Sequence, residues 1–341
     1  MGYICVFDCE TIPNAPLLRR VFDYEGDDYS VSLQAFNEQE SKTGSSFLPV
    51  HFHQVVSISA VMADEYGRFN RVSTIEGSCE REIIAKFLAF IDKHNPRLVS
   101  FNGRGFDLPM LMVRAMSYNI AVNAYFDTND KALNKDKWTN YRSRYDGVFH
   151  LDLLDHISDF RAVSGLKLDT LCASLNLPGK YDVHGDQVLE LYYNGELDKI
   201  HEYCQSDVLN TYWLFLKYEL LRANITLSDY ASYLGSMNEY LQNKCANMGY
   251  SAVFCEYIER ELERLNGTRS YENDESFDDN TSTKDDENIE ALKVENIDDF
   301  MAKNGLSKGA GALKSAKKAR KTLVIDEAQE EKLPEINLDD E

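Results

Sequence analysis

One stretch near the start of the chain decides its fold: YICVFDCETIP, residues 3–13. Its apolar part, within residues 2–7, has the length and composition of a buried strand. Asp8 and Glu10 follow at the end of that strand, two residues apart, so their side chains point the same way. Two adjacent carboxylates repel each other, and a divalent cation that prefers oxygen ligands, Mg²⁺ or Mn²⁺, would offset that repulsion. Acidic pairs also occur in solvated turns, so this pair alone leaves both interpretations open.

The chain downstream alternates between strand and helix patterns. Apolar or alternating runs predict further strands, and apolar residues at helical spacing predict helices between and after them. The strands are expected at 54–63, 68–75, 97–101 and 148–154, and the helices at 79–94, 108–118 and throughout the region after Leu166. This order predicts an α/β protein with a central mixed sheet that is flanked by helices on both faces.

A second acid, Asp107, follows the expected strand at 97–101. Between them lie Asn102 and a Gly-x-Gly loop, whose glycines Gly103 and Gly105 would let a ligand approach the backbone closely. Asp107 is also a preferred helix N-cap, and Pro109 suits a first helical turn. Capping and metal ligation are compatible, so both interpretations stand.

A third signal lies in the helical region. Tyr203 and Asp207 are four residues apart and therefore share one face of a helix. An exposed Asp beside a half-buried Tyr would be the ordinary alternative. Taken together, four acids and a tyrosine come from a strand end, a helix start and a helix face. A phosphodiester site with two divalent cations needs carboxylates from several elements in this way.

The three segments resemble motifs I, II and III of the DEDD superfamily of 3′–5′ exonucleases, which has a ribonuclease H-like fold. Motif III separates two subtypes: one has His five residues before the last Asp, where this chain has Glu202, and the other has Tyr four before it, which is Tyr203. The chain resembles the tyrosine subtype. Its segments FDCETIP, LVSFNGRGFDLPML and YCQSDVLNTY are similar to those of stand-alone bacterial exonucleases related to the proofreading domain of family B DNA polymerases. The similarity covers residues 3–222.

The resemblance implies a role for each catalytic residue. Asp8 would contact both of two divalent cations, Mg²⁺ or Mn²⁺, and Glu10 and Asp207 would complete the site of the catalytic ion. Asp107 would hold the second ion, and Tyr203 would orient the attacking water. Cys9 stands where Ile or Leu is more usual, and its side chain is expected to point away from the metals.

Six residues are expected to bind substrate: Thr11, Asn102, Gly103, Arg104, Phe106 and Lys180. Asn102 matches the Asn of motif II and would position the terminal nucleotide. Arg104 and Lys180 are suitable phosphate contacts, and Phe106 is suited to stacking on a base, although an aromatic ring at that position also fits the core.

Three further residues are weaker candidates for the site. His184, near Lys180, would contact phosphate or belong to a surface loop. His150 and Asp152 would lie at the rim of the site or make structural hydrogen bonds.

The expected activity is the metal-dependent removal of nucleotides from single-stranded or frayed 3′ ends of DNA. The products would be nucleoside 5′-monophosphates, and the setting would be proofreading in trans or repair. The same chemistry on RNA is an alternative, since no residue reports on the 2′-hydroxyl. A non-catalytic nucleic-acid-binding module on the same fold is a third interpretation, which the presence of all four acids and Tyr203 disfavours.

Composition limits the remaining classes. The chain has 36 basic and 57 acidic residues, a net charge of −21, which disfavours a non-specific coat on nucleic acid. A local basic patch from Lys167, Lys180 and Arg104 is therefore expected around the site. No apolar run approaches the ~18 residues of a membrane span, and the N-terminus has no basic region of a signal peptide. Seven scattered cysteines without a Cys-x-x-Cys pair fit a reducing, cytoplasmic location.

Three regions are expected along the chain. Residues 1–222 would form the exonuclease domain and 223–266 additional helices packed on it. Residues 267–341 hold 20 acidic and 11 basic residues with a basic block at 314–321, and a composition this polar predicts a mostly disordered tail with a short helix at 289–303. That tail would be a solvated extension or a tether for nucleic acid or an unknown protein partner.

Overall fold

The computed structural model describes residues 2–180 and 185–268, and every structural statement below concerns them. The expectations for the acidic tail after Thr268, for its basic block at 314–321 and for His184 lie outside the described residues.

A five-stranded mixed sheet in the order β3-β2-β1-β4-β5 forms the centre of the fold. Its strands are β1 (Tyr3–Pro13), β2 (His53–Asp64), β3 (Phe69–Thr74), β4 (Arg97–Ser100) and β5 (His150–Asp152). The first three pair antiparallel, whereas β4 runs parallel to β1, and β5 runs parallel to β4. The sequence-based prediction of an α/β, ribonuclease H-like fold with a mixed sheet is confirmed.

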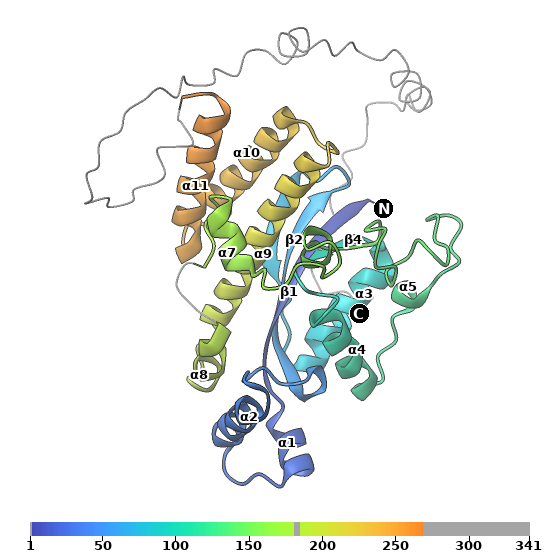
Figure 1. The fold of residues 1–341 in the computed structure, drawn as a ribbon, viewed down its shortest axis with the longest axis vertical. Coiled ribbons are helices and arrows are strands. Elements are labelled where there is room, and N and C mark those ends of the chain that lie inside the picture. Colours follow the sequence, from blue (N-terminus) through green and yellow to red (C-terminus); the bar gives the residue numbers. More distant parts are fainter. Residues whose placement is uncertain (1, 181–184, 269–341) are drawn as a thin grey trace, which may run out of the picture. The chain divides into compact units, whose positions relative to one another are not determined.

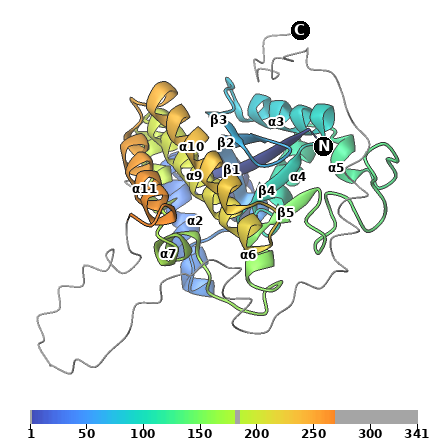
Figure 2. The same cartoon turned by 90° about the horizontal axis from the view of Figure 1, so that it is seen from above.

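Helices cover both faces of this sheet. One side carries α3 (Glu80–His94), α4 (Asp107–Ser117) and α5 (Asn123–Phe126), and the other carries α9 (Leu197–Leu221), α10 (Leu227–Lys244) and α11 (Gly249–Leu265), as Figure 2 shows. Shorter helices connect β5 to α9: α6 (Leu153–Ile157), α7 (Leu168–Ser174) and α8 (Val188–Tyr193). Among the described helices, none is both long enough and apolar enough to cross a lipid bilayer.

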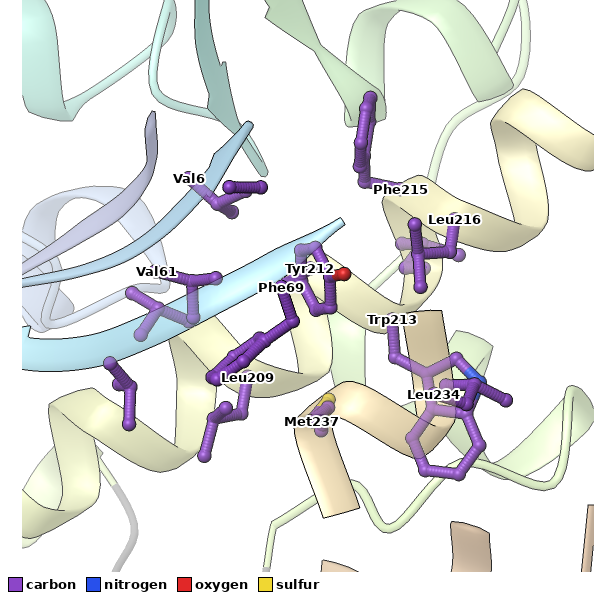
Figure 3. Packing of buried hydrophobic residues seen from close by; sticks show 14 of the residues in the cluster. Val6, Val61, Phe69, Leu209, Tyr212, Trp213, Phe215, Leu216, Leu234 and Met237 are labelled. Atoms are coloured by element: carbon purple, nitrogen blue, oxygen red, sulfur yellow. The ribbon is translucent and has the colours of Figure 1, made fainter. Parts of the chain in front are cut away.

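The main core lies between the sheet and α9–α11. Val6 and Val61 from β1 and β2 face the buried side chains of Tyr212 and Trp213 from α9 (Figure 3). The indole N–H of Trp213 donates to the Tyr230 hydroxyl of α10 at 2.8 Å, so the polar group of this large side chain is paired inside the core. α9 is buried along most of its length and links the core to the site described below.

Two features differ from the sequence-based expectation. β1 does not end before Asp8 but continues to Pro13, and its register with β2 is irregular between Glu10 and Thr11. The segment after it, where no element was predicted, forms α1 (Ala15–Phe22) and α2 (Asp28–Thr43), at the lower end of Figure 1. These helices bury a small cluster of their own around Leu18 and Val31, a local pairing that the polar sequence of α2 conceals.

Candidate active site

Two carboxylates on β1 converge with a thiol from α9. The ligand atoms of Asp8, Glu10 and Cys204 all lie within 4.8 Å of one another. The Cys204 thiol donates to the backbone carbonyl of Asp8 at 3.5 Å. The prediction that Asp8 and Glu10 point the same way is therefore correct, because alternate residues of a strand share a face.

Asp107 reaches the same place from the start of α4. It is the first residue of that helix and not its cap, so the simple capping interpretation is wrong. Its side chain is 3% exposed, and its charge acts on the carboxyl of Asp8 and on the thiol of Cys9. That the Cys9 side chain points away from the metals stays a prediction, although the charge of Asp107 reaches its thiol. One carboxylate oxygen of Asp107, Oδ1, is buried without a hydrogen-bond partner.

Tyr203 and Asp207 complete the cluster from one face of α9. The Tyr203 hydroxyl lies beside the Asp207 carboxylate, and both side chains are buried. The two neighbours of Tyr203 that could have filled its place point elsewhere: His201 bonds the Ser57 hydroxyl at 2.9 Å, and Glu202 accepts from the backbone N–H of Gly249. The helix therefore presents the tyrosine to the carboxylates.

The acids raise one another's pKa. Burial and then the negative charges of the other three acids raise the pKa of Asp8 well above its ordinary value. Burial raises the pKa of Asp107 to about 7, and that of Asp207 to about 7 as well. Burial and the nearby carboxylates also raise the pKa of Tyr203, so this hydroxyl keeps its proton at neutral pH. The cluster therefore disfavours its own ionised form and favours a bound positive charge.

The residues present fit divalent cations. Four carboxylates come from β1, α4 and α9, three of them buried and that of Asp8 half-buried, and the orphaned Oδ1 of Asp107 is an acceptor that lacks a donor. Carboxylate oxygens are the ligands that hard cations such as Mg²⁺ and Mn²⁺ prefer. Lys180 supplies a positive charge that lowers the pKa of Glu10 and of Asp207, but one ammonium does not balance four carboxylates.

The loop before Asp107 is held by β5. Asp152 accepts the backbone N–H groups of Asn102 and Arg104 at 2.9 and 2.8 Å, so its interactions are structural. His150 likewise bonds the Ser100 hydroxyl at 2.8 Å. A Cβ on Gly103 would lie 2.3 Å from the Ser100 hydroxyl oxygen, so packing inside the loop already requires glycine there. This loop is preorganised by contacts within the protein.

Arg104 is turned toward the segment before β5. Its guanidinium donates to the carbonyls of Tyr141, Arg142 and Ser143 at 3.0–3.3 Å. These contacts hold the guanidinium in place and occupy most of its donors. The expected basic patch of Lys167, Lys180 and Arg104 therefore has one member, Lys180, whose charge acts on the carboxylates.

Phe106 and Thr11 meet beside the acids through His53. Thr11 Oγ1 lies 2.8 Å from His53 Nδ1, and the His53 ring packs edge-on against Phe106 with 4.9 Å between centroids. Phe47, an exposed ring, packs on Phe106 at the same separation. Two predicted substrate-binding residues thus belong to one aromatic group next to Glu10 and Asp107.

Lys180 is fixed by α9. Asn210, three residues after Asp207, accepts from the N–H of Gly179 and donates to its carbonyl at 3.0 and 2.9 Å. Lys180 follows directly and pairs with Asp169 at 3.1 Å. The same helix that carries Tyr203 therefore also sets the position of the lysine.

Sequence reasoning missed the residues that support the site from a distance. His53 contacts Thr11 across 42 positions, and Arg161 donates to the Asn102 side chain at 2.6 Å across 59 positions. Neither residue lies in a recognisable motif, and only the folded chain brings it to its partner. The residues predicted to be catalytic gather at one place, and their roles stay predictions: Asp8, Glu10, Asp107, Tyr203 and Asp207.

The mixed sheet and the buried carboxylate cluster together define an α/β protein with an exonuclease fold. The family model described as a predicted 3′–5′ exonuclease related to the exonuclease domain of PolB matches residues 45–258. The chain belongs to this family, and it is an enzyme of the 3′–5′ exonuclease class with a nucleic-acid substrate. Asp8 and Glu10 lie before the matched residues, whereas Asp107, Tyr203 and Asp207 lie within them.

Similar proteins include DNA polymerases. A DNA polymerase of Archaeoglobus fulgidus is 26% identical over 151 residues, which are 44% of this chain and 18% of that protein. The solved family B DNA polymerase of the archaeon Pyrobaculum calidifontis matches with a TM-score of 0.39 and 17% identity, over 79% of this chain and 29% of that one. The chain thus spans less than a fifth of the length of the Archaeoglobus relative.

Proposed function

We propose that the protein is a divalent-cation-dependent 3′–5′ exonuclease that hydrolyses single-stranded DNA ends to nucleoside 5′-monophosphates, in proofreading in trans or repair. One observation carries this proposal: four carboxylates from three elements, three of them buried, repel one another, the single ammonium of Lys180 does not balance them, and Asp107 Oδ1 has no donor. Such a cluster is costly to a fold unless cations bind to it.

Asp8, Glu10, Asp107 and Asp207 would hold two cations. When bound, such cations lower the pKa of water and stabilise negative charge on the leaving oxygen. Tyr203 acts as a hydrogen-bond donor, because burial and the nearby carboxylates raise its pKa and keep the proton on the hydroxyl. It therefore positions the attacking water or a phosphate oxygen and does not remove a proton.

The remaining predicted residues would grip the terminal nucleotide. Asn102 and Thr11 flank the acids on the loop before α4 and on β1, and Phe106 offers an aromatic ring for a base. The charge of Lys180 acts on Glu10 and Asp207, so this ammonium would contact a phosphate bound there. A grip on one nucleotide agrees with a chain that is acidic in total.

A gel assay with 5′-labelled oligonucleotides tests the proposal. Single-stranded DNA and RNA of the same sequence are incubated with Mg²⁺, Mn²⁺ or EDTA, with wild type and Asp8→Ala. The expected result is a ladder that shortens from the 3′ end of DNA with metal only, and that Asp8→Ala does not produce. Faster degradation of the RNA would identify RNA as the preferred substrate. If both oligonucleotides stay intact, the exonuclease proposal is overturned.

A further inference from the structure

A second candidate site lies in the segment between α5 and β5, residues 127–149. This segment, which follows α5 in Figure 1, contains a cavity of about 680 Å³. Its lining combines aromatic and basic side chains: Trp138, Tyr145, Lys137, Arg142 and Arg144. None of them belongs to the carboxylate cluster.

The aromatic side chains of this cavity are open to solvent. Trp138 is 72% exposed and Tyr145 is 68% exposed. Burying such rings would stabilise the fold, so their exposure leaves them free to stack on a ligand. The second tryptophan of the chain, Trp213, is fully buried in the core, which makes Trp138 the exposed indole of the protein.

The cations of the cavity lie over rings. The Lys137 ammonium is 4.8 Å from the centre of the Trp138 ring, and the Arg142 guanidinium is 5.4 Å from that of Phe126. Both basic side chains belong to exposed residues. Exposed aromatic rings interleaved with cations are the arrangement that proteins use for single-stranded nucleic acid, with bases on the rings and phosphates on the cations.

Hydrogen bonds connect this surface to the candidate active site. Arg104, three residues before Asp107, holds the carbonyls of residues 141–143. Asp155 binds both Arg144 of the cavity and Arg161 through its carboxylate, at 2.8 and 2.9 Å. Arg161 in turn donates to Asn102. A line of arginines therefore runs from the residue predicted to hold the terminal nucleotide to the cavity.

A strained turn keeps that line in place. Asp159, Phe160 and Arg161 all have positive φ, between 48° and 75°, which L-residues adopt rarely and at a cost. The turn places the Phe160 ring 4.6 Å from Tyr145 and the Arg161 guanidinium on Asn102. The turn therefore contacts both Tyr145 of the cavity and Asn102 of the loop before α4.

We propose that this surface, which we call the Trp138 platform (Lys137, Trp138, Arg142, Arg144 and Tyr145), binds the part of a single strand that lies 5′ of the nucleotide in the active site. Bases stack on Trp138 and Tyr145, and phosphates contact Lys137 and Arg142. The proposal rests on the proposed exonuclease function, since it states where the nucleotides 5′ of the terminal one bind. A strand of a few nucleotides fills the active site alone, whereas a longer one reaches the platform.

The test uses the full chain with Asp8→Asn, so that the oligonucleotide is not consumed. Unlabelled oligo(dT) and oligo(rU) of about 3 and about 16 nucleotides are titrated while tryptophan fluorescence is followed. Because Trp213 is buried, quenching reports stacking on Trp138. The 16-mer is expected to quench and the 3-mer to leave the signal unchanged, with the DNA and RNA arms showing which sugar is preferred.

Variants locate the binding surface. Lys137→Ala with Arg142→Ala is expected to raise the Kd of a fluorescent 16-mer at least about fivefold and to reduce the slope of log Kd against log salt by about 1.4, or 0.7 for each lost phosphate contact. Trp138→Ala should raise the same Kd by about fivefold or more. The matched control, Arg81→Ala with Tyr66→Ala, removes an exposed cation and an exposed ring elsewhere and should change neither quantity.

The outcomes separate the platform from the exonuclease proposal. Equal Kd values for the control and the platform variants, or a 16-mer that binds without quenching, would overturn the platform. Absence of 16-mer binding would do the same. In the protein with Asp8 intact, platform variants should slow cleavage of the 16-mer but not of the 3-mer. Quenching without any cleavage would contradict the exonuclease and retain the platform.

Discussion

The surroundings of Glu261 and of the four acids in the candidate active site shift carboxyl pKa values in opposite directions. Glu261 on α11 is 4% exposed, but it accepts from Lys217, Tyr230 and Arg264 at 2.7–3.0 Å. Although burial raises the pKa of Glu261, these partners lower it below its ordinary value. Of the four acids of the candidate active site three are buried and Asp8 is half-buried, and their mutual repulsion adds to the effect of desolvation, so that the pKa of Asp8 and of Glu10 rises.

The comparison separates a carboxylate that is neutralised by cations of the protein itself from carboxylates that need a bound cation. A carboxylate whose charge is matched by the protein stabilises the structure, whereas a group of carboxylates that lacks such partners is tolerated because of what it binds. The carboxylates of β1, α4 and α9 are thus assigned to function, and Glu261 of α11 to stability.

The largest expected effect, on the rate of nucleotide release, comes from removing the charge of one acid in the candidate active site. Asp8→Asn should lower the rate of nucleotide release at least ~10³-fold, because the cations it would hold account for several kcal/mol of transition-state stabilisation. Single-turnover kinetics with single-stranded DNA measure this. Glu202→Gln, one residue before Tyr203 and facing α11, is the control and should keep its rate. Equal losses in the two variants would contradict the assignment.

Removing the charge of Glu261, which is paired within the protein, should lower the stability of the fold and leave activity unchanged. Glu261→Gln leaves Lys217 and Arg264 without their carboxylate, and a buried charge that loses its partner costs about 3–5 kcal/mol. We expect the melting temperature to fall by roughly 10 °C in a calorimetric scan. Activity measured well below the transition should stay at the wild-type level, and a selective loss of activity would place Glu261 in the site.

Tyr203→Phe sharpens the role of the hydroxyl. The variant keeps the ring in the core but removes the donor that lies beside Asp207, and loss of one such donor costs about 10²-fold in kcat. Since the hydroxyl keeps its proton, the loss should be equal at pH 7 and pH 9. A variant whose deficit disappears as the pH rises would identify Tyr203 as a base and contradict its role as a donor.

The smallest effect concerns pH and the metal-free protein. The pKa of Asp107 rises from 3.8 to about 7 on folding, so the folded state holds an extra proton between these values. Stability in EDTA should therefore fall as the pH rises from about 4 to about 7 and stay low above it. Asp107→Asn removes this penalty and should raise the melting temperature by a few degrees at pH 8, and not at pH 4.

Added Mg²⁺ supplies the control for that measurement. It should raise the melting temperature of the wild type at pH 8 and raise that of Asp107→Asn less, because a ligand that binds only the folded state stabilises it more when its Kd is lower. A wild type that is equally stable with Mg²⁺ and with EDTA at every pH would contradict the assignment of these acids to cations.

Much of the fold follows from local patterns, and the rest does not. The strands of the sheet after β1 and the helices α3 and α4 lie within a few residues of their predicted bounds, because their apolar periodicity directly reflects burial. β1 runs past Asp8 because antiparallel pairing with β2 continues there, which residue type alone does not reveal. α1 and α2 pack mainly on each other, so their pattern is faint.

The candidate site divides in the same way. Asp8, Glu10, Asp107, Tyr203 and Asp207 are recognisable because each stands at a fixed place in its own element. The direction of a side chain depends on what lies opposite, however. Arg104 was expected to meet phosphate, but it binds three carbonyls of a segment some 40 positions away. Burial and then the charge of Asp107, which α4 brings to β1, raise the pKa of the Cys9 thiol, and the sequence does not reveal this proximity.

One helix, α9, ties all of this together over its 25 residues. It carries Tyr203 and Asp207 near its beginning, Asn210 on the Lys180 loop, and Tyr212 and Trp213 in the core. Because this helix is continuous, the active site is not expected to unfold locally while the core stays folded. Heat inactivation of this protein should accordingly coincide with its global melting curve, and a substitution that disturbs the packing of α10 or α11 should lower the temperatures of inactivation and of melting together.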